Sequence, residues 1–112
     1  MSPGGPSGDD LLRVLSTLAN PHRLRVLAAL AAEDDYVSRL ARRLGISRPL
    51  LQVHLRKLEA AGLVTARTEL SDDGKALKYY EVNPFAIELT PRSVEAAVRT
   101  LTVPGDETKG SG

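Results

Sequence analysis

A helix-turn-helix pattern in residues 38–62 constrains the fold of this chain more than any other feature. Ser38 is a good helix N-cap, and Gly45 is expected to end the helix that follows, because glycine adopts the left-handed conformation at little cost. Ser47 caps a second helix with Pro49 in its first turn, and Gly62 stops it. A short helix, a tight turn and a capped helix are typical of the layout whose second helix lies in the DNA major groove.

The flanking segments predict three more helices and a hairpin. One helix begins at Asp9 or Asp10, and Asn20-Pro21 opens a second, whose expected inner face is Leu24, Leu27, Ala28 and Ala31. Thr90-Pro91 opens a last helix. Segments 63–69 and 77–82, rich in Thr, Val and Tyr, predict a β-hairpin, and Tyr36-Val37 a further short strand. The expected fold class is mainly α with a small β-hairpin wing, a winged helix-turn-helix with about five helices.

The composition fits one small domain with a helical core. The chain has 112 residues, 42% hydrophobic and only 4% aromatic, so the core must consist of leucine, valine and alanine. We expect one domain at 9–103 and disordered tails at 1–8 and 104–112, which are rich in Gly, Ser and Pro. No apolar run approaches the ~18–20 residues of a membrane span. The absence of cysteine excludes thiolate and disulfide chemistry and is compatible with a cytoplasmic protein.

Positive charge is concentrated in the middle of the chain. Although the net charge is +1, segment 38–82 contains nine basic and five acidic residues. A basic segment between mildly acidic ends is typical of a nucleic-acid-binding face, although a solvated charge pattern would look the same.

The second helix of the pattern has two chemically different sides. Leu51, Leu55 and Leu58 cluster on one side, and long polar side chains lie opposite, where Arg can bind guanine and Gln adenine. Val53 can contact thymine methyl groups, whereas Leu50 can instead cover the edge of the core. The hairpin adds cations suited to phosphate or minor-groove contact. The expected DNA-binding residues are Arg48, Pro49, Gln52, Val53, Arg56, Lys57, Arg67, Lys75 and Lys78.

Residues 9–101 resemble the ArsR/SmtB-type winged helix-turn-helix repressors of bacteria. The resemblance lies in LANPHRLRVL at 18–27, LARRLGISRP at 40–49, HLRKLEAAGLV at 54–64 and YYEVN at 79–83. It implies a sequence-specific regulator of transcription that binds double-stranded DNA, with a repressor-type mechanism and a homodimer on a pseudo-palindromic operator. It also implies a dimer interface on the first and last helices, at Leu11, Leu15, Leu18, Val94, Ala97, Val98 and Leu101.

The chain departs from the metal-sensing members of that family. Those sensors carry paired cysteines before the recognition helix, or His and acidic ligands on the last helix, whereas here residues 38–42 contain no sulfur and the last helix offers Glu95 without histidine. His54 is expected to be a scaffold or phosphate-contacting residue, and His22 an exposed one and a weak candidate metal ligand. No cofactor is expected, and the ligand spacing does not support a metal site.

Two alternatives to this interpretation remain at the level of sequence. The winged helix can serve as a protein-interaction module, or the regulator can respond to nickel or zinc through a non-standard weak site or a partner sensor protein. The chain contains no Gly-rich phosphate loop, metal motif or nucleophile elbow, so we do not expect an enzyme.

Overall fold

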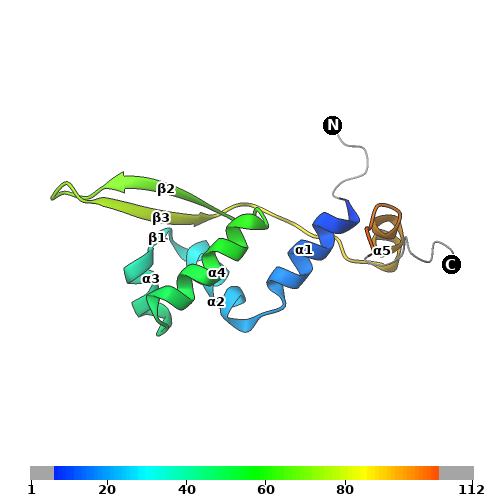
Figure 1. Cartoon of the computed structure of the whole chain (residues 1–112), viewed down its shortest axis with the longest axis horizontal. Helices are drawn as coiled ribbons and strands as arrows, with labels where there is room; N and C mark the ends of the chain where they lie inside the picture. Colours follow the sequence, from blue (N-terminus) through cyan, green and yellow to red (C-terminus); the bar gives the residue numbers. More distant parts are fainter. Residues whose placement is uncertain (1–6, 104–112) are drawn as a thin grey trace. The chain divides into compact units, whose positions relative to one another are not determined.

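The computed structural model describes residues 7–103, within which the chain forms five helices and three strands (Figure 1). They are α1 (Gly8–Leu18), α2 (Pro21–Ala32), β1 (Asp35–Tyr36), α3 (Val37–Leu44), α4 (Arg48–Ala60), β2 (Val64–Leu70), β3 (Ala76–Val82) and α5 (Pro91–Val98). The described residues group into two compact units, one of residues 14–85 and one that joins residues 7–13 to residues 86–103. None of the helices described over 7–103 is long and apolar enough to cross a membrane.

Three helices begin at the predicted caps. The Asn20 side chain accepts hydrogen bonds from the backbone N–H of His22 and of Arg23, at 2.8 and 3.1 Å, and Ser47 Oγ accepts one from the Leu50 N–H at 3.2 Å. Thr90 forms a reciprocal capping box at the start of α5. These caps satisfy backbone N–H groups that have no partner within a helix.

The start of α3 differs from the prediction. Its N-cap is Tyr36, which makes no side-chain cap hydrogen bond, so Ser38 lies inside the helix. The predicted strand is shifted by one residue to Asp35–Tyr36, since Val37 already belongs to the helix. The turn after α3 is as predicted, with Gly45 in the left-handed conformation at a φ of 69°.

The strands form one antiparallel sheet in the order β1-β3-β2. The predicted hairpin pairs Val64 with Val82 and Leu70 with Ala76, and Asp35 of β1 pairs with Tyr80 on the other edge of β3. Short β1 therefore attaches the wing to the segment that leads directly into α3 (Figure 1).

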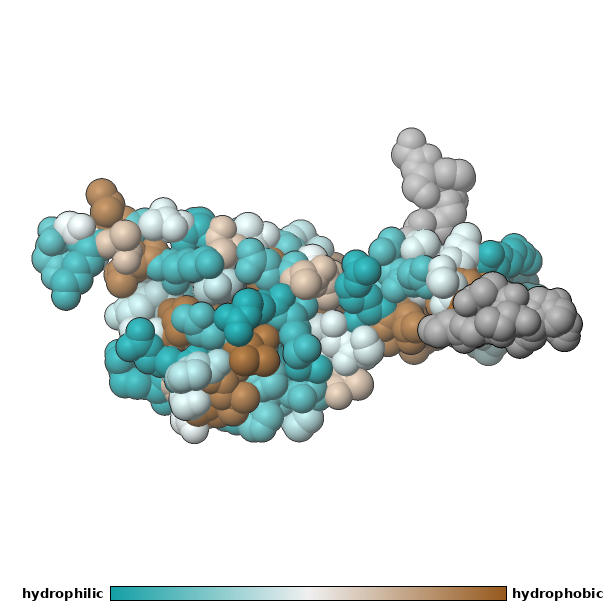
Figure 2. Space-filling model, in the orientation of Figure 1, coloured by the Kyte–Doolittle hydropathy of each residue, from teal (hydrophilic) through white to brown (hydrophobic). Residues whose placement is uncertain are grey.

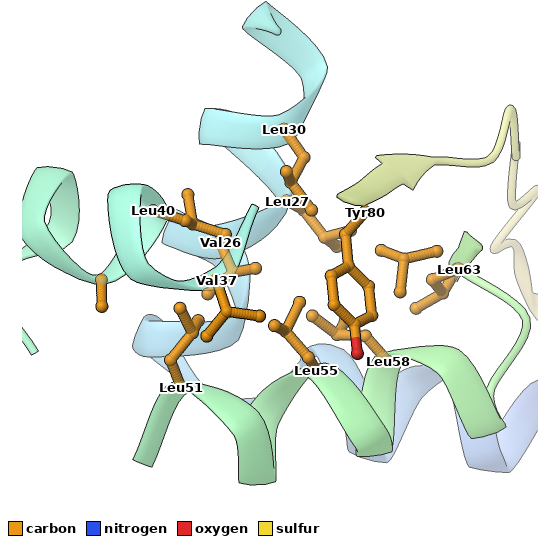
Figure 3. Packing of buried hydrophobic residues seen from close by; sticks show 12 residues of the cluster. Val26, Leu27, Leu30, Val37, Leu40, Leu51, Leu55, Leu58, Leu63 and Tyr80 are labelled. Atoms are coloured by element: carbon orange, nitrogen blue, oxygen red, sulfur yellow. The ribbon is translucent and has the colours of Figure 1, made fainter. Parts of the chain in front are cut away.

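The core of the larger unit is built where α2, α3, α4 and the sheet meet. Figure 3 shows leucine and valine side chains from the three helices pointing toward one another, with the ring of Tyr80 directed toward Leu55 and Leu58. The buried residues are Val26, Leu27, Leu30, Val37, Leu40, Ala41, Leu51, Leu55, Leu58, Leu63, Val64 and Tyr80.

The prediction of which α2 residues face the core is wrong for all but Leu27. Leu27 is buried as expected, but Leu24 is 52% exposed and its neighbours Ala28 and Ala31 are also exposed, while Val26 and Leu30 take the inner positions. The helix is apolar on several sides, so the Ala-containing stripe and the Val-containing stripe are equally periodic.

The smaller unit is held by bonds between the start of α1 and the residues that follow α5. The Gly8 N–H donates to Thr100 Oγ1 at 2.7 Å, and the Thr102 N–H donates to Asp9 Oδ1 at 2.8 Å. The latter bond lowers the pKa of Asp9. Gly8, predicted as the last residue of the N-terminal tail, begins α1, and Ser7 directly precedes it. The other residues of the predicted tails, 1–6 and 104–112, lie outside the described residues.

Candidate nucleic-acid interface

Helix α4 separates its buried and exposed side chains as the sequence predicts. Leu51, Leu55 and Leu58 have no exposed surface, so this stripe anchors the helix in the core. The opposite side is exposed and presents Arg48, Pro49, Gln52, Val53, Arg56 and Lys57. Figure 2 shows apolar surface over α4 bordered by hydrophilic residues.

The exposed side of α4 forms an open, shallow depression. Its volume is about 610 Å³, and its lining is Arg48, Pro49, Gln52, Val53 and Arg56. Among residues 7–103, no acidic side chain forms an ion pair with Arg48, Arg56 or Lys57. The cations on this face are therefore available to a polyanion.

Helix α3 holds α4 at its N-terminal end through the tight turn. The Arg25 guanidinium of α2 donates to the Leu44 carbonyl at 3.2 Å, and the Ile46 N–H donates to the Ala41 carbonyl at 3.2 Å. Ile46 is partly buried and packs against the core. The first turns of α4 thus start from a fixed position.

Arg67 on the wing is engaged within the protein. Its guanidinium lies 2.6 Å from Glu69, 2.5 Å from Glu81 and 3.3 Å from Asp34, and it stacks over the Tyr79 ring. The hydrogen bond to Glu69 raises the pKa of Arg67 further. Three carboxylates around one cation leave little net positive charge for phosphate, so Arg67 instead links β2 and β3 to Asp34, the residue before β1.

Two other wing cations are more accessible. Lys78 is exposed and lies 5.7 Å above the Tyr80 ring, and Lys75 is exposed beside the hairpin turn. Within the described part of the chain neither lysine forms an ion pair. The tip itself carries Asp72 and Asp73, which repel phosphate, so contact is expected on the sides of the hairpin.

A buried ion pair beside α3 was missed at the level of sequence. The Asp35 side chain has no exposed surface, and it accepts from Arg43 Nη1 at 2.7 Å and from the Tyr36 N–H at 2.9 Å. Arg39 Nε lies 3.8 Å from the same carboxylate. The signal in the sequence was the placement of arginines four and eight residues after an acid.

The two histidines lie against each other between α2 and α4. Their rings are stacked with centroids 5.6 Å apart, His54 is buried and His22 is half-buried, so the expectation of an exposed His22 is wrong. Arg23 Nη1 donates to His54 Nδ1 at 3.3 Å, which requires a neutral imidazole. Burial lowers the pKa of His54, and the charges of Arg23, His22 and Lys57 lower it further.

This arrangement does not resemble a metal centre. Within residues 7–103, no three His, Asp or Glu side chains are grouped closely enough to hold an ion. The Arg23 cation beside His54 also disfavours a second positive charge. His54 has the buried position expected of a scaffold residue.

The residues predicted for a dimer interface have mixed exposure. Val94 and Val98 on α5 are 43% and 58% exposed, and Ala97, Leu101, Leu11 and Leu15 are half-buried. Leu101 lies beyond the end of α5, and Leu18 packs against the core of its own unit together with Val14. Leu12, which the prediction omitted, is 54% exposed near the start of α1.

Comparison with known proteins identifies the family of this chain. Residues 20–66 match the family described as "Bacterial regulatory protein, arsR family". An uncharacterized HTH-type transcriptional regulator of Methanocaldococcus jannaschii is 34% identical over 76 residues, which cover 68% of this chain and 79% of that protein.

The chain belongs to the ArsR family. This ArsR-family protein is a DNA-binding transcriptional regulator, and the family is not one of enzymes. It is 33% identical over 81 residues to a "Probable mercury resistance operon repressor" of Streptomyces lividans, which covers 72% of this chain and 62% of that protein.

The fold also matches a solved structure. The homodimeric winged helix-turn-helix DNA-binding domain of a possible ArsR-family regulator from Mycobacterium bovis aligns with a TM-score of 0.58 and 32% identity. The alignment covers 65% of this chain and 63% of that one.

Proposed function

We propose that this ArsR-family regulator is a cytoplasmic, repressor-type protein that binds a pseudo-palindromic operator as a homodimer. The observation that carries the proposal is the exposed side of α4, where Arg48, Gln52 and Arg56 surround a shallow depression on a helix anchored by buried leucines. Such a helix fits the major groove, and a two-fold dimer would place two copies one turn of DNA apart.

Within this proposal the exposed residues have different tasks. Arg48 and Gln52 lie on the first two turns of α4 and read base edges, while Arg56, Lys57, Lys75 and Lys78 contact phosphates. Pro49 and Val53 lie between the polar groups against the groove. Arg67 is excluded from this set, because its charge is already balanced by three carboxylates.

The first test is a titration of duplex DNA at several salt concentrations. With roughly 6–10 phosphate contacts per dimer, affinity should fall by about 10³–10⁵ between 50 and 200 mM salt. Arg48→Ala or Gln52→Ala should cost about 1–3 kcal/mol on the cognate site and relax sequence preference, whereas Arg56→Ala should weaken cognate and scrambled duplexes alike. Arg92→Ala, an exposed arginine on α5, is the matched control. A flat salt response would contradict the proposal.

The second test addresses the homodimer. Val98→Glu places a charge in the apolar face of α5, where burying it unpaired would cost several kcal/mol. Ala96→Glu adds the same charge on the opposite side of α5 and is the control. Light scattering should show a monomer for the first variant and a dimer for the second, with DNA affinity falling only for the first. Two DNA-binding dimers would refute this interface.

Two relatives support the choice of mechanism. The Mycobacterium bovis domain is described as homodimeric, and the Streptomyces lividans protein as a probable operon repressor. This chain has no cysteine, so a thiolate site for mercury is not part of the proposal. Its signal would be a different effector or a partner sensor protein.

A further inference from the structure

Two apolar side chains stand among the polar groups on the outside of the recognition helix α4. Leu50 is 41% exposed and Val53 is 39% exposed, although both lie on a helix that buries three other leucines completely. Leu50 can cover the edge of the core with only part of its surface, because two-fifths of it is exposed. Both side chains are therefore available to whatever α4 binds.

We propose that Val53 and Leu50 read the 5-methyl groups of thymines in the operator, an inference that rests on the proposed DNA binding. The C5-methyl group is the apolar feature that a base pair exposes in the major groove, and it is contacted by apolar side chains. Val53 lies in the depression lined by Arg48, Gln52 and Arg56. Arg48 and Gln52, the proposed base-reading groups, thus lie beside the side chain that contacts the methyl, and the proposed phosphate contact Arg56 completes the lining.

The chemistry of the rim identifies DNA rather than an apolar protein partner. Arg48, Arg56 and Lys57 carry no ion pair within residues 7–103, and each would be desolvated at a cost if a protein covered the face without acidic groups. Two apolar side chains are also far less than the buried core of a protein interface requires. Their size fits one or two methyl groups.

Position on the helix distinguishes the two residues. With 100° per residue, Val53 projects close to the direction opposite the buried stripe, while Leu50 lies nearer its edge beside His54. Valine has two methyl groups on a stiff side chain, so its apolar surface is fixed before binding. Val53 is therefore the principal reader, and Leu50 contacts a methyl at the flank.

The same contact discriminates against other bases. A guanine or cytosine opposite Val53 would have polar groups facing an aliphatic side chain that offers no hydrogen bond. The preference for thymine thus combines a favourable methyl contact with a penalty for an unpaired polar edge.

The test uses a duplex that the full-length protein selects from a random library. Each thymine of the selected site is replaced in turn by deoxyuridine, which removes the methyl and keeps the base pair. At one or two positions per half-site, affinity should fall about fourfold per lost methyl, which corresponds to about 0.8 kcal/mol. Replacement of the equivalent thymine in both half-sites should lower affinity about 15-fold.

Variants then assign each methyl to a side chain. In Val53→Ala the ratio of thymine to uracil affinity at the principal position should fall from about four to about one, and Leu50→Ala should do the same at a neighbouring position. Leu24→Ala removes an exposed leucine from α2, outside the recognition helix, and should leave every ratio unchanged. All three positions are exposed, and circular dichroism checks that the variants fold.

Different outcomes would overturn different statements. A selected site without thymine at these positions, or uracil effects that persist in both α4 variants, would overturn methyl reading while leaving DNA binding intact. If no duplex binds even at low salt, the proposed function is wrong and the methyl contact falls with it.

Discussion

The buried carboxylate of Asp35 makes Arg43 a residue on which stability depends. The Asp35 side chain has no exposed surface, and the closest positive charge is Arg43 Nη1, which lies 2.7 Å from Asp35 Oδ2. In Arg43→Met the apolar stem is kept and the charge is lost. The carboxylate then retains the Tyr36 N–H at 2.9 Å and Arg39 at 3.8 Å, of which only the first is a good hydrogen bond.

The size of the effect follows from the exposure of the two partners. Removing one member of a fully buried pair costs about 3–5 kcal/mol, because the remaining charge has no compensation. The Arg43 side chain is 32% exposed, which weakens the pair through solvent screening. We therefore expect the free energy of unfolding to fall by about 2–4 kcal/mol, a large part of the 5–15 kcal/mol that holds a typical domain together.

Arg42→Met is a matched control on the same helix. Arg42 is exposed, and no ion pair involves it within the described residues. Its loss should change stability by less than about 0.5 kcal/mol. Urea denaturation followed by circular dichroism, at one fixed protein concentration, should show the midpoint of Arg43→Met lower by about 2 M if m is near 1.5 kcal/mol/M. Equal midpoints for the two variants would refute the assignment of Asp35 as a charge that needs Arg43.

Two further predictions concern pH and salt. Because the pKa of His54 is lowered on folding, stability should be full above pH ~6.5 and should decline as pH falls through that value toward the folded pKa; His54→Gln should flatten this acid limb in denaturation measured from pH 7.5 to 5. Lys75→Ala should lower the slope of log affinity against log salt by about one unit, whereas Arg67→Ala should change it less and should instead weaken the hairpin. Equal slopes for the two variants would contradict the neutralisation of Arg67.

The sequence predicts most reliably where the chemistry is local. Asn20, Ser47 and Thr90 are each followed within two residues by proline, and all three cap helices in the structure. A cap requires only a side-chain oxygen and the next two or three backbone N–H groups, so neighbours along the chain decide it. The opposite sides of α4 were predictable for the same reason, because leucines and polar residues alternate at helical spacing.

Local sequence could not predict which side of α2 faces the core. Leu24, Val26 and Leu30 are all apolar, and which of them is inside depends on where α3, α4 and β3 lie. The structure selects Val26 and Leu30, and Leu24 remains 52% exposed. In an Ala- and Leu-rich helix hydrophobic periodicity gives several equivalent solutions, and tertiary packing chooses among them.

The ion pairs of the wing and of α3 depend on residues that are far apart in sequence. Arg67 and Asp34 are 33 positions apart, and only the β1-β3-β2 order of the sheet brings them together. Arg67 was therefore predicted as a phosphate contact from its charge alone. The structure makes a phosphate contact by Arg67 less favourable, because a cation shared by three carboxylates attracts phosphate less strongly.

The ion pairs of the arginines limit how steeply DNA affinity can depend on salt. Segment 38–82 contains nine basic residues, but three of them form ion pairs: Arg39 and Arg43 with Glu33 and Asp35, and Arg67 with Asp34, Glu69 and Glu81. Six unpaired cations per protomer remain in this segment. In the proposed dimer this segment can therefore contact up to twelve DNA phosphates, compared with eighteen if all its basic residues were free. At about 0.9 per neutralised phosphate, its salt slope should be no steeper than about −11. A steeper slope would require that DNA displaces the carboxylates from the paired arginines or that cations outside this segment join the interface.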